Sequence, residues 1–172
     1  MSGGGSDDNL GIDPGYAIVG WGVIEYNRSH FTVLGYGAIE TPAGLKTEQR
    51  LSMIFDGVNE LIKTYKPDQM AIEELFFNTN ITTGIKVAEA RGVIIMAANK
   101  LGVEVYEYTP LQVKQSVVGY GRADKKQVIT MVTMLLNLPK PPKPDDTADA
   151  LAIAVCHAHT GTSRISQYYN QK

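Results

Sequence analysis

The sequence predicts an α/β fold in which a mixed five-stranded sheet is flanked by helices. Two patterns point to this class: three strand-like segments separated by turn signals fill the first forty residues, and short apolar segments then alternate with helical periodicity. A strand that follows a helix usually returns parallel to an earlier strand, so the last two strands should join the sheet in parallel. With 172 residues, the chain has the length of a single domain.

The start of the chain predicts a three-stranded antiparallel meander. Strands are expected at residues 10–13, 18–25 and 31–40, with turns at Pro14-Gly15 and at Asn27-Arg28-Ser29. The segment Asp7-Asp8-Asn9 is a poor sequence for a buried central strand. We therefore expect a linker, an expression scar or an altered terminus over residues 1–9. One domain should cover residues 10–160, and residues 161–172 should form a polar, frayed tail.

Helical periodicity begins after the meander. Apolar residues recur at steps of three and four from Leu51 to Tyr65, and Pro67 ends that pattern. Gly102 should stop a second helix, and Asp124 can cap a later one. The predicted helices cover residues 51–65, 81–101, a short stretch from Pro110, 124–136 and 145–160, and the later strands cover 69–72 and 104–108.

Composition and charge exclude several classes of protein. Hydrophobic residues make up 44% of the chain and no apolar run approaches the roughly 20 residues that cross a bilayer, so neither a disordered chain nor a membrane-spanning one is expected. Cys156 is the single cysteine, which fits a reducing cytoplasm. The net charge is −2, yet residues 100–144 hold seven basic and three acidic residues. That segment either binds a polyanion or is an ordinary solvated surface.

Four carboxylates stand where the predicted elements begin or end. Asp13 ends the first strand, Glu73 ends the fourth, and Asp146 and Asp149 open the last helix on one face. If the two strands are parallel neighbours, Asp13 and Glu73 emerge at the same edge of the sheet, where ligands of open α/β sheets bind. Such an oxygen-rich set suits Mg²⁺ or Mn²⁺ better than zinc.

Each of these acids also has a purely structural interpretation. Asp13 can serve a turn, and Asp146 and Asp149 can satisfy a helix N-terminus. Glu73 is harder to explain in this way, because a carboxylate beside a buried strand is costly without a partner. His157 and His159 are expected to be helix-surface or core residues rather than ligands.

Five segments stand in order along most of the chain: Gly-Ile-Asp-Pro-Gly at 11–15, Ala-Ile-Glu-Glu-Leu-Phe-Phe at 71–77, Ala-Arg-Gly at 90–92, Gln-Val-Lys-Gln-Ser-Val-Val-Gly at 112–119 and Asp-Asp-Thr-Ala-Asp-Ala-Leu-Ala at 145–152. Together they resemble the RuvC family of Holliday junction resolvases. The resemblance implies a ribonuclease H-like fold, which agrees with the element order. This sequence departs from the family at residues 7–9, where the family usually has an aliphatic run.

The resemblance also implies an activity and its residues. The chain would be a metal-dependent endodeoxyribonuclease that nicks two strands of a four-way DNA junction symmetrically, in recombination and repair. Its catalytic metal ligands would be Asp13, Glu73, Asp146 and Asp149, holding two Mg²⁺ ions for which Mn²⁺ could substitute. The implied partners are junction DNA, a second copy of the chain and the RuvAB branch-migration complex, in the bacterial cytoplasm.

Several further residues are candidates for contacts with DNA. The resemblance points to Phe76 as an aromatic that meets junction bases, and to Lys114 and Lys125 near the scissile phosphates. Arg122 and Lys126 belong to the same basic segment and could complete a basic rim. Phe76 and Phe77 could equally be core residues.

Residues 93–98 are apolar around the whole predicted helix, which favours either a subunit interface or burial under a neighbouring helix. Ile94 and Ile95 are the candidates to face a partner. Two alternative functions stay open: a ribonuclease H-like enzyme that cuts RNA–DNA hybrids, and a junction-binding module without catalysis. A nucleotide phosphotransferase would need a longer chain and a second phosphate loop.

Overall fold

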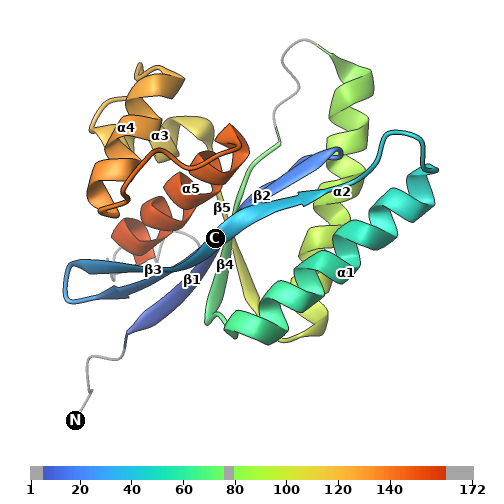
Figure 1. The fold of residues 1–172 in the computed structure, drawn as a ribbon, viewed down its shortest axis with the longest axis horizontal. Coiled ribbons are helices and arrows are strands. Elements are labelled where there is room, and N and C mark those ends of the chain that lie inside the picture. Colours follow the sequence, from blue (N-terminus) through green and yellow to red (C-terminus); the bar gives the residue numbers. More distant parts are fainter. Residues whose placement is uncertain (1–5, 76–79, 162–172) are drawn as a thin grey trace, which may run out of the picture.

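The computed structural model describes residues 6–75 and 80–161, and its strands form one mixed sheet in the order β3-β2-β1-β4-β5 (Figure 1). The strands are β1 (Asp7–Asp13), β2 (Ile18–Asn27), β3 (His30–Glu40), β4 (Gln69–Glu73) and β5 (Glu104–Tyr108). β1 is the central strand, antiparallel to β2 and parallel to β4, and β5 is parallel to β4. The predicted sheet, with three antiparallel strands followed by two parallel ones, is therefore confirmed.

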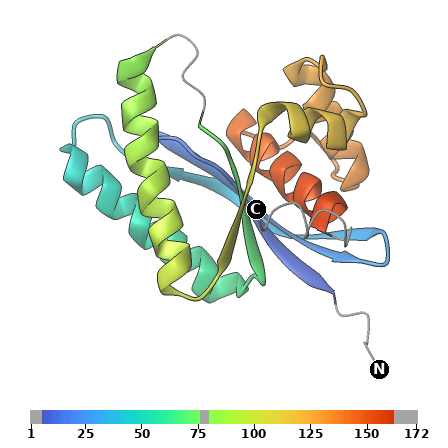
Figure 2. The same cartoon turned by 180° about the vertical axis from the view of Figure 1, so that it is seen from behind.

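Helices cover both faces of this sheet (Figures 1 and 2). They are α1 (Thr47–Tyr65), α2 (Ile81–Lys100), α3 (Pro110–Val118), α4 (Lys125–Leu135) and α5 (Asp145–Gly161). α1 and α2 pack on one face around Leu10, Ile12 and Ile94, whereas α5, backed by α3 and α4, packs on the other around Leu151 and Ile153. No helix in the described part of the chain is long and apolar enough to cross a membrane.

Local sequence signals explain most element ends. Gly102 (φ 75°), two residues after α2, and Gly119 (φ 94°), directly after α3, adopt the positive φ of a left-handed residue that ends a helix. Asp124 caps α4 by accepting a hydrogen bond from the backbone N–H of Gln127. Arg28 and Ser29 both have positive φ, the backbone of a tight hairpin turn between β2 and β3.

The first strand begins earlier than its polar sequence predicts. Asp7, Asp8 and Asn9 belong to β1, so the expected linker over residues 1–9 is wrong for residues 7–9. Their backbone pairs with β2, and Asp8 exchanges two further hydrogen bonds of 2.8 Å with Asp68. Asp68, which is distant in sequence, thus supplies hydrogen bonds that allow polar residues at the start of the central strand β1.

The apolar stretch of α2 does not behave as one uniform surface. Ile94 is fully buried against the sheet, so it cannot face a partner subunit. Ile95 is half-buried, and Met96 has half of its surface exposed. The exposed side of α2 runs through Ile81, Ile85 and Met96 instead.

Candidate active site

Asp13 and Glu73 end neighbouring parallel strands at the same edge of the sheet. The register pairs Ile12 of β1 with Ile72 of β4, and each acid follows one residue later. β1 is the middle strand of five, so Asp13 lies at the centre of that edge. The predicted convergence of these two carboxylates is confirmed.

α5 brings two more acids to this edge because glycines let it approach the sheet closely. A methyl group on Gly20, the partner of Asp13 in β2, would overlap the backbone carbonyl of Asp146. A methyl group on Gly11 would likewise overlap the carbonyl of Ala150. These glycines were not identified as site residues from the sequence. They let the start of α5, which carries Asp146 and Asp149 in its first two turns, rest on the strands beside Asp13.

The carboxylates are close enough to perturb one another's ionisation. The pKa of Asp13 is raised to about 8, first by burial and then by the negative charges of Asp149, Glu73 and Asp146, against an opposing effect of Lys125. The pKa of Glu73 is also raised, first by burial and then by Asp149, while Lys114 opposes it. The other three predicted acids therefore all lie close enough to Asp13 to affect its ionisation.

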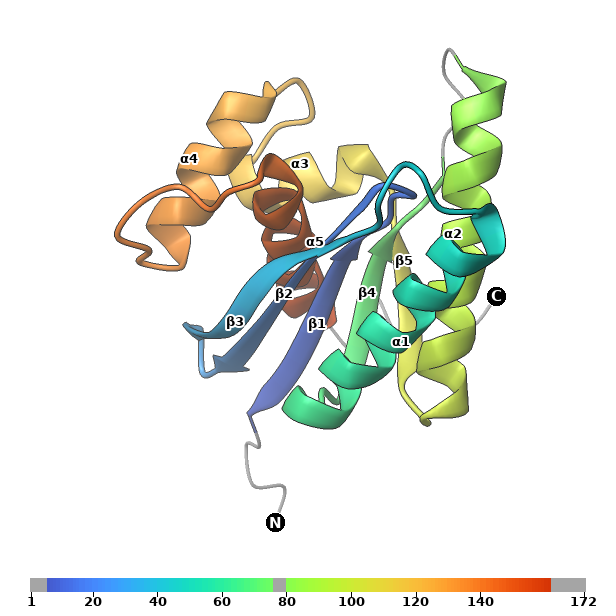
Figure 3. The same ribbon diagram turned by 45° about the vertical axis from the view of Figure 1, so that its right-hand side comes forward.

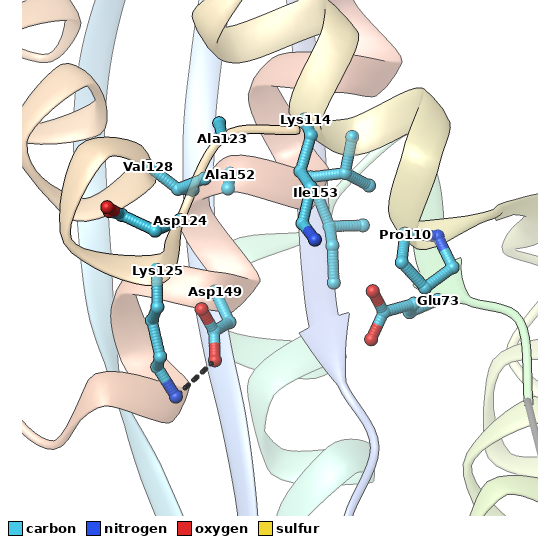
Figure 4. A pocket seen from close by; sticks show the side chains of 11 residues that line it. Glu73, Pro110, Lys114, Ala123, Asp124, Lys125, Val128, Asp149, Ala152 and Ile153 are labelled. Atoms are coloured by element: carbon cyan, nitrogen blue, oxygen red, sulfur yellow. Dashed lines mark ion pairs between the residues drawn. The ribbon is translucent and has the colours of Figure 1, made fainter. Parts of the chain in front are cut away.

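Two lysines face this acid cluster from α3 and α4. Glu73, Lys114, Lys125 and Asp149 line one pocket of about 300 Å³ (Figure 4). Lys125 Nζ lies 3.4 Å from Asp149 Oδ2 and 4.0 Å from an oxygen of Asp145. The pKa of Asp149 is still raised, because its burial outweighs the opposing effect of Lys125.

The other two predicted basic residues stand apart from this pocket. Arg122, in the loop before α4, and Lys126, in the first turn of α4, are both exposed. Neither is among the residues that line the pocket. Of the predicted basic rim, the structure thus brings Lys114 and Lys125 to the acids. Phe76 and Phe77 lie outside the described residues.

Arg91 of α2 supports the end of β4, a role that the sequence did not reveal. Its Nε donates a hydrogen bond of 3.1 Å to the backbone carbonyl of Glu73. Its Nη2 lies 2.8 Å from a carboxylate oxygen of Glu107 on β5. In the sequence, Arg91 stands out only as part of the Ala-Arg-Gly segment at 90–92 that resembles the family.

The two histidines of α5 are structural, as predicted. His157 is buried, and its ring bonds to the Tyr108 hydroxyl and, at 2.6 Å, to Oε1 of Gln69. Burial lowers its pKa to about 4, so the ring is neutral at physiological pH. His159 lies on the helix surface, with its ring against Tyr26 and Phe31.

The donor set fits a hard divalent cation. Each of the four groups offers carboxylate oxygens, which Mg²⁺ and Mn²⁺ prefer, and the charges of the other three carboxylates add to the effect of burial in raising the pKa of Asp13. Among the described residues, no three His, Cys, Asp or Glu side chains already stand grouped as ligands of one ion.

Comparison with known proteins agrees with this geometry. The family model described as crossover junction endodeoxyribonuclease RuvC matches residues 9–157. Crossover junction endodeoxyribonuclease RuvC of Alkaliphilus metalliredigens is 60% identical over 152 residues, which cover 88% of this chain and 93% of that protein. The protein of the same name from Clostridioides difficile is 58% identical, covering 88% of this chain and 89% of that one.

Solved structures show the same relationship. Thermus thermophilus RuvC in complex with a Holliday junction substrate superposes with a TM-score of 0.84 at 37% identity, covering 88% of this chain and 93% of the other. The yeast mitochondrial Holliday junction resolvase Ydc2, at 12% identity, has a TM-score of 0.63 over 95% of this chain and 86% of its own, and shares the fold. The predicted ribonuclease H-like fold is confirmed. On these grounds, the chain belongs to the RuvC family of crossover junction endodeoxyribonucleases.

Proposed function

We propose that this chain resolves four-way DNA junctions by hydrolysing phosphodiester bonds at Asp13, Glu73, Asp146 and Asp149. The observation that carries the proposal is that these acids come together from β1, β4 and α5. The charges of the other three contribute to the raised pKa of Asp13. A site of this kind needs cations to ionise fully, and a phosphodiester substrate needs its charge neutralised. Family membership supplies the substrate class.

Nucleases of this family depend on divalent metal, and we propose that two Mg²⁺ ions, replaceable by Mn²⁺, serve this site. When bound, such ions activate a water and neutralise charge on the attacked phosphate. Asp13 is the carboxylate best placed to serve both ions, because it stands at the centre of the sheet edge. Glu73 would hold metal from the β4 side of the site, and Asp146 and Asp149 would hold it from the α5 side.

The protein groups around the acids position the DNA. Lys114 and Lys125 line the pocket with Glu73 and Asp149, so their ammonium groups can hold phosphates beside the scissile one. Arg91 keeps the Glu73 backbone in place, and the close packing of α5 on Gly20 fixes Asp146. Preorganisation of this type reduces the reorganisation that the reaction would otherwise require.

A homodimer would present two such sites to two symmetric strands. Support comes from α2, on which Ile81, Ile85 and Met96 are 72%, 49% and 50% exposed. They recur at steps of 4 and 11, close to whole helical turns, and so share one side of the helix. Large apolar side chains gathered in this way are typical of an interface between proteins.

Further parts of the proposal concern groups that act beyond the pocket. Phe76 would stack on a base at the branch point, a contact worth about 1–3 kcal/mol in single-strand binders. Arg122 and Lys126 would touch DNA arms outside the pocket. We also propose that the enzyme works in the bacterial cytoplasm with the RuvAB branch-migration complex, a placement supported by its bacterial relatives.

Incubation with a synthetic four-way junction and Mg²⁺ tests the proposal, with each strand labelled separately and the products mapped. We expect paired nicks at symmetric positions in two strands, and no comparable cutting of linear duplex of the same sequence. Preferential cutting of an RNA–DNA hybrid would favour the alternative ribonuclease H-like activity. Tight junction binding without any cutting would favour a non-catalytic module.

A further inference from the structure

A cluster of cations and an aromatic ring lies at the acid end of the sheet, on the side away from Lys114 and Lys125. Tyr16 follows Asp13 by three residues, in the turn between β1 and β2. Arg50 belongs to the first turns of α1, and Lys86 to the second turn of α2. We call Tyr16, Thr41, Thr47, Arg50 and Lys86 the Tyr16 cluster.

Its position follows from the two helical layers. α2 begins at the same end of the sheet as the β1–β2 turn and the start of α5, but it belongs to the opposite layer (Figure 3). Three residues span at most about 10 Å of chain, so Tyr16 stays close to Asp13. The acid cluster therefore lies between the Tyr16 cluster on one side and the lysines of α3 and α4 on the other.

Tyr16 is held from several directions. Its backbone carbonyl accepts a hydrogen bond of 2.7 Å from the Thr41 hydroxyl, and its own hydroxyl donates one of 3.1 Å to Thr47 Oγ1. The Arg50 guanidinium carbon lies 4.0 Å from the centre of its ring, and Lys86 Nζ lies 5.5 Å from it. Both distances are within the range of cation–π attraction.

Arg50 contributes a fixed positive charge. The side chain is buried, and its Nε and Nη2 donate hydrogen bonds of 2.8 and 3.2 Å to Thr41. Those acceptors are neutral, and among the described residues Arg50 makes no ion pair. A buried charge that no carboxylate compensates raises the local potential and attracts an anion.

Lys86 presents its charge to solvent in a fixed direction. Nζ donates a hydrogen bond of 3.0 Å to Thr47 Oγ1, which uses one of its three N–H groups. Glu89 is 4.0 Å away, at the limit of an ion pair, and 39% of the Lys86 side chain is exposed. An ammonium held in place, with donors still available, is suited to a phosphate oxygen.

We propose that Lys86, oriented by Tyr16 and Thr47 with Arg50 behind it, binds a backbone phosphate of the junction on the side of the acids opposite Lys114 and Lys125. This inference rests on the proposed function. The strand that crosses the active site would then be held on both sides of the bond to be cut. A backbone phosphate is the occupant because it is the anion that junction DNA offers at every nucleotide next to the cut.

The test compares charge variants at the two ends of α2. Junction affinity is measured without divalent metal over a range of KCl concentrations for wild type, Lys86→Gln and Lys86→Arg. Lys100→Gln is the matched control, because Lys100 is an exposed lysine in the last turn of the same helix. We expect Lys86→Gln to flatten the plot of log affinity against log salt by about 0.7–0.9, the effect of one lost phosphate contact. Lys86→Arg and Lys100→Gln should keep the wild-type slope.

Junctions with one neutral methylphosphonate next to the cleavage site locate the contact. Neutralising the phosphate that Lys86 binds should weaken binding by wild type but not by Lys86→Gln. The Lys125→Ala variant should still respond to that phosphate, but not to neutralisation of the phosphate that Lys125 binds. If Lys86→Gln lowers the melting temperature while the salt slope and the methylphosphonate response stay at wild-type values, Lys86 only fastens α2 to α1 and the inference is wrong. Wild-type junction cutting, measured in parallel, fails only if the proposed function itself is wrong.

Discussion

The ammonium nitrogen of Lys125 lies 3.4 Å from Oδ2 of Asp149, so a residue predicted to hold DNA is paired with one predicted to hold metal. Binding of metal at Asp149 would weaken this pair and free Lys125 for a phosphate. We therefore propose that metal binding and DNA binding in this pocket are coupled through this contact.

Lys125→Ala tests whether this lysine holds a phosphate of the junction. We expect weaker junction binding and a salt slope flattened by about 1, because one phosphate contact is lost. Lys63→Ala, which removes an exposed lysine in the last turn of α1, is the control and should bind as wild type. The measurement is junction affinity against KCl concentration. An unchanged slope in Lys125→Ala would show that this lysine serves only Asp149.

The pH dependence of stability should report on Asp13. Its pKa is raised to about 8, so between about pH 4 and 8 the folded protein holds a proton that the unfolded chain has released. Without metal, this group therefore makes the free energy of unfolding fall as pH rises, by at most about 1.4 kcal/mol per pH unit.

Thermal melting between pH 6.5 and 8.5, in EDTA and in Mg²⁺, measures this effect. This range avoids most of the opposite contribution of His157, whose pKa is lowered to about 4 and whose stabilising effect is lost as pH falls from about 6.5 to 4. We expect Asp13→Asn to flatten the profile in EDTA, and Mg²⁺ to raise the wild-type melting temperature more at pH 8 than at pH 6.5. Parallel profiles for wild type and Asp13→Asn would contradict the assignment.

The exposed side of α2 should control assembly. Ile85→Asp or Met96→Asp places a charge on a surface already in contact with solvent in one chain, so each variant should fold but become monomeric. Met134→Asp is the matched control, since Met134 is 69% exposed on α4, in the other helical layer. Light scattering at micromolar concentration measures the mass. A monomeric wild type would refute the dimer.

Close packing at Gly20 should matter for catalysis. A methyl group there overlaps the Asp146 carbonyl, so Gly20→Ala must displace the start of α5, with an overpacking cost of about 1–3 kcal/mol. We expect cleavage to fall more than junction binding. Gly44→Ala is the control, because its methyl group would meet nothing within 4 Å. Equal cleavage rates for the two variants, measured in single-turnover assays, would mean that the position of α5 is not critical.

Elements marked by local signals could be predicted from the sequence. Strand β5 and the start of α2 lie where periodicity and turn residues put them, and the meeting of Asp13 with Glu73 follows from parallel strand ends. The four acids could be proposed as a site because each stands at or near the end of an element. Lys114 and Lys125 were found mainly through the family resemblance.

Features that depend on distant partners could not be predicted. Asp7 and Asp8 extend β1 because Asp68 and β2 supply hydrogen bonds. The apolar stretch of α2 gave no sign that Ile94 faces the core and Met96 the solvent, because periodicity cannot select a side when every side is apolar. The contacts of Arg91 and Lys86 likewise appear only when α2 is placed against the sheet and α1.

The central claim is that the carboxylates around Asp13 form the catalytic centre, and Glu73→Gln tests it most directly. This variant keeps the shape of the side chain and removes its charge, so the junction should bind at least as tightly as to wild type. The measurement is single-turnover cleavage of a labelled four-way junction in saturating Mg²⁺, with junction affinity determined on the same samples. We predict intact binding with cleavage lowered by several orders of magnitude, whereas cleavage by Glu73→Gln near the wild-type rate would contradict the assignment.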